Sequence, residues 1–133
     1  MFGSQRKLVS VVITDPGGDF SVPILRMDEN TTIEAVYVCP DTTVAASTTA
    51  YYDIQLLDGG LIGTGTGTIS SVIGGTVGWV ANTQKAGEMV AGSSKLDAGD
   101  WLVAKYAETG SVAPGRICVA VEYVVGVGDK AAA

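Results

Sequence analysis

The feature that most constrains the fold of this chain is a series of short runs rich in β-branched and aromatic residues, separated by glycine-rich turns. No amphipathic helix of usable length lies between these runs, which excludes the parallel pairing that needs helical crossovers. We therefore expect an all-β fold of about eight strands, an antiparallel two-sheet sandwich with jelly-roll or other Greek-key topology. The expected strands are Leu8–Thr14, Phe20–Leu25, Thr32–Cys39, Tyr51–Leu57, Trp101–Tyr106 and Arg116–Val125, with shorter candidates at Thr76–Ala81 and Glu88–Ala91.

The connections predict how the strands are joined. Asp15–Asp19 contains the sequence Asp-Pro-Gly-Gly-Asp, which favours a tight turn and a hairpin between the two strands that flank it. Pro23 lacks an N–H group and marks the second of these as an edge strand. The threonine-rich segment Pro40–Thr49 predicts a long connection that crosses from one sheet to the other.

The segment Gly63–Thr68 alternates glycine with threonine. It predicts a surface loop or a glycine-weakened strand, and the alternative is a loop whose bare backbone lies against a partner. It does not match a phosphate-binding loop, because no Gly-x-x-x-x-Gly-Lys-Ser/Thr pattern is present.

The size of the chain predicts one domain. It has 133 residues, which we divide into an N-terminal arm (1–7), a single sandwich domain (8–125) and a flexible tail (126–133). Hydrophobic residues make up 47% and charged residues 17%, and the mean hydropathy is +0.33. Arg116–Val125 carries few charges on either face, so we expect part of the apolar surface to be buried against a neighbour.

The net charge of −6 argues against nucleic acid and anionic membranes as partners. Arg6 and Lys7 are the only adjacent basic residues, and no run approaches the roughly 20 apolar residues of a membrane span. The run Leu8–Ile13 is too short and too polar for the core of a signal peptide. We expect synthesis in the cytoplasm, unless a leader precedes this sequence.

The two cysteines are Cys39 and Cys118, too few for a disulfide framework. If the glutamates of their strands face outward, strand alternation points Cys39 inward and Cys118 outward. The two thiols would then not meet without a β-bulge, so we expect both to be free.

The sequence offers few groups for catalysis. Histidine is absent, which removes the Ser-His-Asp triad and the commonest metal ligand. Carboxylates come close in sequence only in turns, where they usually bind backbone amides, and none fits the twelve-residue calcium loop. We predict no enzyme activity and no catalytic, metal or cofactor residues. The carboxylate pairs considered are Asp15 with Asp19, Asp28 with Glu29, and Asp97 with Asp100.

The aromatic residues could form a sugar-binding platform, an interface or the core. Trp101 is the best surface candidate, because its expected face also holds Lys105. Tyr51 is the second, since it shares a face with Asp53 and Gln55. The other aromatics considered are Tyr52, Trp79, Tyr106 and Tyr123.

Several stretches resemble the small jelly-roll structural proteins of tailed bacteriophages that decorate or cement the capsid or form its spikes. The resemblance is a pattern of strands and turns over most of Leu8–Val125, and its most recognisable piece is Ala98-Gly99-Asp100 before a strand. It implies a homotrimer bound outside a capsid shell, with the major capsid protein as partner. The stretches that carry it are Thr32–Val38, the threonine-rich crossing into Tyr51–Leu56, Leu96–Val103 and Val119–Tyr123.

The leading hypothesis is therefore a virion structural protein on the capsid exterior, in which an aspartate at an outward valine should break the trimer. The alternative is a carbohydrate-binding or receptor-binding module in which Trp101 or Tyr51 lines a groove. An enzyme subunit and a bacterial surface domain remain as further alternatives. The residues predicted for the partner interface are Arg6, Lys7, Tyr51, Trp101, Val103 and Val124.

Overall fold

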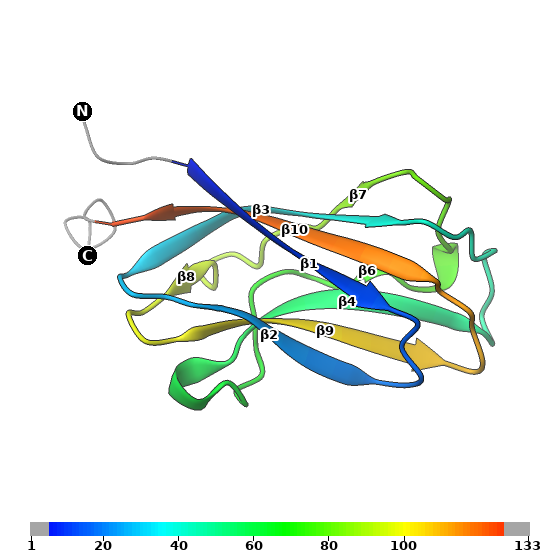
Figure 1. Ribbon diagram of the computed structural model, residues 1–133, viewed down its shortest axis with the longest axis horizontal. Helices are drawn as coiled ribbons and strands as arrows, with labels where there is room; N and C mark the ends of the chain where they lie inside the picture. Colours follow the sequence, from blue (N-terminus) through cyan, green and yellow to red (C-terminus); the bar gives the residue numbers. More distant parts are fainter. Residues whose placement is uncertain (1–5, 127–133) are drawn as a thin grey trace.

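A computed structural model describes residues 6–126 of the chain, and within this range ten strands and two single-turn 3₁₀ helices occur (Figure 1). The strands are β1 (Arg6–Thr14), β2 (Phe20–Arg26), β3 (Thr31–Pro40), β4 (Tyr51–Asp58), β5 (Gly67–Thr68), β6 (Ile73–Gly74), β7 (Lys85–Ala86), β8 (Lys95–Leu96), β9 (Trp101–Thr109) and β10 (Arg116–Val125). The 3₁₀ helices are η1 (Gly60–Ile62) and η2 (Gly75–Val77).

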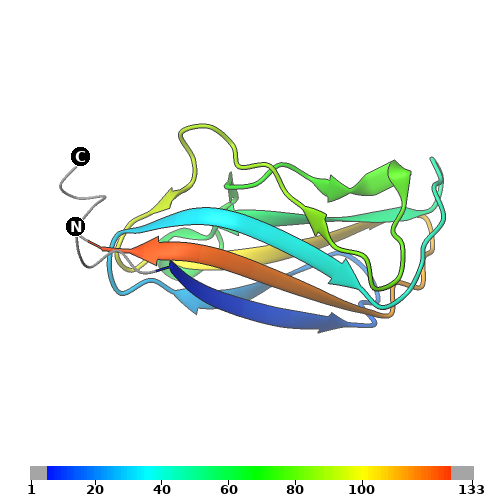
Figure 2. The same cartoon turned by 90° about the horizontal axis from the view of Figure 1, so that it is seen from above.

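The strands form two antiparallel sheets that pack as a jelly-roll sandwich, as the sequence predicts (Figures 1 and 2). One sheet has the order β1-β10-β3-β7, with β8 also on β3. The other has the order β2-β9-β4-β5, with β6 also on β4. Because β5 and β6 share one side of β4, and β7 and β8 share one side of β3, the ten strands fill eight positions.

The expected hairpin between the first two strands is wrong. β1 pairs with β10 and β2 pairs with β9, so Asp15–Asp19 arches from one sheet to the other. Turn residues report a chain reversal, and they do not determine whether the flanking strands bond to each other. Two other predictions are confirmed: β2 is an edge strand with a bulge beside Pro23, and residues 41–50 cross between the sheets.

The two shorter strand candidates are wrong. Thr76–Ala81 begins with the last two residues of η2 and contains only an isolated bridge, from Trp79 to Val44, and Glu88–Ala91 contains only a bridge from Met89 to Ser70. The additional strands are the two-residue elements β5, β6, β7 and β8. Elements of two residues show no alternation of polar and apolar positions, so periodicity could not have located them.

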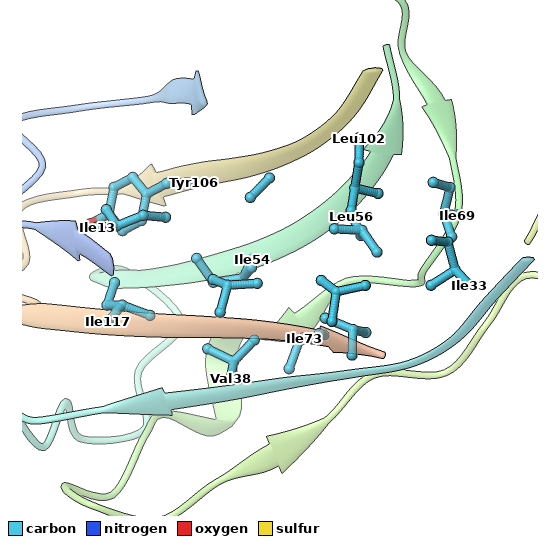
Figure 3. Close-up of a cluster of buried hydrophobic side chains, with 14 of the residues drawn as sticks. Ile13, Ile33, Val38, Ile54, Leu56, Ile69, Ile73, Leu102, Tyr106 and Ile117 are labelled. Carbon is cyan, nitrogen blue, oxygen red and sulfur yellow. The ribbon is translucent and has the colours of Figure 1, made fainter. Parts of the chain in front are cut away.

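The core lies between the sheets and consists of their inward side chains (Figure 3). Ile54 and Leu56 of β4 meet Val38 and Ile117 of the opposite sheet. Alternation predicts the inward direction of Ile54, Leu56 and Ile117, but it places Val38 on the outward face with Glu34. An aromatic stack extends this core. The ring centroid of Tyr52 lies 4.9 Å from that of Trp79 and 5.3 Å from that of Tyr106. The Trp79 Nε1–H donates to the carbonyl oxygen of Tyr52 over 3.1 Å. Tyr52, Trp79 and Tyr106 are therefore core residues.

A β-bulge changes which side chains of β3 face outward. The register of β3 and β10 shifts at Glu34, where Glu122 pairs with Ala35 but Tyr123 pairs with Ile33. The extra residue lets Ile33, Val36 and Val38 all point into the core. The inward prediction for Cys39 is therefore wrong: Cys39 faces outward and is the register partner of Cys118.

Candidate interaction surfaces

The outer surface of the sheet β1-β10-β3 is apolar and uncovered, and we call it the bare face. Figure 2 looks onto it, and no other segment of residues 6–126 crosses in front of these three strands. Leu8 is 66% exposed and Val12 is 56% exposed. The register places the outward residues in three central rows, which are Leu8–Glu122–Ala35, Ser10–Ala120–Tyr37 and Val12–Cys118–Cys39.

Charged pairs lie at the two ends of the bare face. At one end, the Arg6 Nη2 atom lies 3.5 Å from the Glu34 Oε1 atom, and the Arg6 Nη1 atom lies 3.7 Å from the Glu122 Oε1 atom. At the other end, the Arg116 Nε lies 3.3 Å from Asp41. The Arg116 backbone N–H, the Thr42 hydroxyl and the Arg116 guanidinium hold the pKa of Asp41 below its ordinary value. The two rows between these ends, those of Ser10 and Val12, carry no charge, as is typical of the centre of a protein interface.

The outer surface of the sheet β2-β9-β4 is different, because residues 59–66 fold back over it, and we call it the covered face. The Gly59 N–H donates to the Trp101 carbonyl oxygen over 2.8 Å, and the Gly65 N–H donates to the Gly59 carbonyl oxygen over 2.8 Å. A Cβ atom at Gly59 would lie 2.7 Å from the Val103 Cγ2 atom, so the backbone packs directly on this side chain. The backbone of this glycine-rich loop thus packs against the sheet of its own chain.

Val103 is consequently not available on the surface. The sequence places it correctly on the outward side of its strand, but the loop leaves only 2% of it exposed. Leu57 on the neighbouring strand is buried in the same way, with 4% exposed. The expectation that Val103 is exposed is wrong, because strand alternation gives the direction of a side chain and says nothing about which loop covers it.

The other residues predicted for an interface do not form one patch. Arg6 and Val124 are register partners on the bare face. Lys7 is exposed and belongs to the same strand as Arg6, but it alternates to the other side. Trp101 and Tyr51 are half-buried and belong to the covered face, at opposite ends of the pair β4-β9.

Sequence reasoning missed Leu8 and Val12, the most exposed apolar residues of the bare face. A signal was present, because the run Leu8–Ile13 is apolar at both odd and even positions apart from Ser10. A strand that is apolar on both sides needs a cover on both sides. In residues 6–126, the core covers only the side of Val9, Val11 and Ile13.

Two further exposed apolar groups lie away from the sheet faces. Leu61 and Ile62 of η1 are 72% and 81% exposed at one end of the sandwich. Val72 and Val77 are also exposed, and they flank a depression of about 530 Å³ beside β6 and β7.

Several carboxylates of the turns bind backbone amides, whereas Asp28 pairs with the guanidinium of Arg26. Asp19 accepts the Glu108 N–H over 2.8 Å, and Asp100 accepts the Asp97 N–H over 3.0 Å. Asp58 accepts the Gly60 N–H over 2.9 Å, which holds the start of the loop on the covered face. Within residues 6–126, Asp, Glu and Cys side chains form no group of three or more that could hold a metal ion. The helices of this range are too short to cross a membrane.

Comparison with known proteins gives a likeness of fold. No family model and no curated protein matches the chain. A chain of the cyanophage Pam1 capsid asymmetric unit matches with a TM-score of 0.60 and 17% sequence identity, over 95% of this chain and 89% of that one. A chain of the infectious bursal disease virus Gt strain matches with a TM-score of 0.38 and 8% identity, over 95% of this chain and 34% of that one, which is too weak to support an argument. At 17% identity the first match shows a shared jelly-roll fold.

Proposed function

We propose that this chain is a non-enzymatic structural protein of a phage virion that binds the outside of the capsid as a decoration or cement protein. The observation that carries this proposal is the match to a chain of a phage capsid asymmetric unit. The aligned region spans nearly all of both chains, so the two are of similar size and share one complete jelly roll. The proposed partners are further copies of this chain, as a homotrimer, and the major capsid protein.

The bare face supports this proposal, because it gives the chain a surface that suits association. Its exposed side chains include two large aliphatics, and its rows of Ser10 and Val12 lack charge. Such a surface loses little polar hydration when it is covered, and burial of its apolar area stabilises the complex. The net charge of −6 on the whole chain limits non-specific association.

Two measurements test the proposal. Light scattering coupled to gel filtration should give a mass of three times 13.6 kDa. The purified protein should also co-sediment with capsids of the phage that encodes it. A chain that stays monomeric and remains in the supernatant at saturating capsid concentration contradicts the proposal.

We do not propose glycan binding as a second function. Tyr52, Trp79 and Tyr106 are buried in the core, each with 1% or less of its surface exposed. Trp101 and Tyr51 are each half-buried and lie at opposite ends of their strand pair, so they do not form one aromatic platform.

A further inference from the structure

Cys39 and Cys118 are direct neighbours on the bare face, although they lie far apart in the sequence. They are register partners in the antiparallel pair β3-β10, and both are partly exposed. Directly opposite residues of such a pair project to the same side of the sheet. The two thiols, together with Val12 and Arg116, line a shallow depression of about 320 Å³ that opens to solvent.

The register also defines the spacing of the two cysteines. The Asp41 N–H donates to the Arg116 carbonyl oxygen over 2.9 Å, so this pair is hydrogen-bonded. Hydrogen-bonded and non-hydrogen-bonded pairs alternate along an antiparallel ladder, which makes Pro40–Ile117 non-bonded and Cys39–Cys118 bonded. The Cα atoms of a bonded pair are about 5.5 Å apart. Disulfides span Cα separations of roughly 4.4–6.8 Å, so the Cα spacing of this pair fits. Disulfides also need Cβ atoms roughly 3.5–4.5 Å apart, whereas those of a bonded pair lie near the wide end of about 4.5–5.5 Å, so the two Cβ atoms must approach by about 1 Å.

We infer that Cys39 and Cys118 form a dithiol site that is oxidised to an intramolecular disulfide between β3 and β10. The oxidant is a low-molecular-weight disulfide such as glutathione disulfide. One cysteine, as thiolate, attacks the oxidant, and the resulting mixed disulfide releases one glutathione thiol. The second cysteine then attacks the protein sulfur of this mixed disulfide and releases the second glutathione. The dithiol loses two electrons and two protons, and glutathione disulfide is reduced to two thiols.

Bond formation requires a side-chain rotation and a small local approach of the two strands. The Cys39 Sγ atom lies 4.0 Å from the carbonyl oxygen of Pro40, so this rotamer is directed toward its own chain. Rotation about the Cα–Cβ bond turns the sulfur toward Cys118, and the bare face leaves room for it. The product would join the two central strands of the β1-β10-β3 sheet across a long stretch of sequence, which restricts the unfolded chain.

The test uses the full chain, first reduced and then incubated with glutathione disulfide. The number of free thiols should fall from two to none, without retained glutathione and without dimers on a non-reducing gel. Peptide mapping without reduction should link the peptide of Cys39 to that of Cys118. The matched controls are C39S and C118S, and each should end with one glutathione bound to its remaining cysteine.

Three results would overturn the inference: wild-type protein that keeps both thiols, that carries two glutathiones, or that is linked only between chains. Denaturant unfolding is a second measurement. The midpoint of the linked protein should lie above that of the reduced protein, and the C39S/C118S double variant should not respond to the oxidant. A linked protein with an unchanged or lower midpoint contradicts the stabilising role of the bond. All of these readouts are made on the purified chain, without capsids.

Discussion

The bare face and the covered face belong to the two sheets of one sandwich, yet they use their outward apolar residues differently. On the covered face, residues 59–66 bury Val103 and Leu57, and these side chains contribute to the stability of the chain. On the bare face, Leu8 and Val12 remain exposed. We propose that a partner molecule covers them. An outward valine in this fold therefore either stabilises the chain or is available to a partner. Whether a loop covers it determines which.

The largest effect is expected for a charge beneath the loop. V103D places a carboxylate where 2% of the side chain is exposed, with the backbone of Gly59 directly above it. Burial of an unpaired charge should lower the free energy of unfolding by about 3 kcal/mol or more. Urea denaturation of the purified variant measures this loss. A variant as stable as wild type would show that the loop does not cover Val103 in solution.

A smaller loss of unfolding free energy is expected for a substitution that pushes the loop away from the sheet. G59A adds a Cβ atom 2.7 Å from the Val103 Cγ2 atom, and the backbone of Gly63 also lies within 3.1 Å. The φ angle of Gly59 is −78°, so alanine meets no backbone strain there and the contact alone should cost about 1–3 kcal/mol. The matched control is G17A, whose added Cβ has no neighbour within 4 Å. Equal stability of the two variants would contradict close packing at Gly59.

The loop anchor should also respond to pH. Partial burial raises the pKa of Asp58, the Gly60 amide offsets part of this effect, and the charges of Asp100 and Asp97 raise the pKa further. The folded state then binds a proton more tightly than the unfolded state. The resulting stability is present below pH 3.8 and is lost as the pH rises through the folded-state pKa. D58N should remove this component, so the difference in unfolding free energy between wild type and D58N should change across acidic pH. If the difference in unfolding free energy between wild type and D58N does not change with pH, the raised pKa of Asp58 is contradicted.

The smallest effect on stability is expected for a charge on the bare face. V12D introduces the same group as V103D, but at a position that is 56% exposed. Water can hydrate this carboxylate, so the free energy of unfolding of the monomer should change by no more than about 0.5 kcal/mol. Urea denaturation at low protein concentration measures it. A large loss would mean that the bare face is covered by its own chain.

The sheets of this protein could be predicted more fully than its surfaces. The long strands and their inward residues follow from alternation, as in Tyr52, Ile54 and Leu56 of β4. The bulge at Glu34 could not be predicted, because it depends on pairing with the distant strand β10. That one residue reverses the orientation of Cys39 and brings it beside Cys118.

The exposed interface residues were harder to predict than the strands, because exposure also depends on distant parts of the chain. Val103 and Val12 are both apolar residues on the outward side of a strand, and their neighbours in sequence do not distinguish them. The difference comes from the glycine-threonine loop, whose path across the sheet depends on contacts with Gly59 and Trp101. The direction of a side chain on a strand follows from the local sequence, whereas its burial by a loop depends on the whole fold.

Capsid co-sedimentation of three proteins tests the central claim, that the bare face is the association surface of a virion structural protein. The wild type is compared with V12D on the bare face and with S21D on the covered-face sheet, where Ser21 is exposed and pairs with Lys105. Wild type and S21D should sediment with the capsids, and V12D should stay in the supernatant. Equal sedimentation of V12D and S21D would contradict the claim.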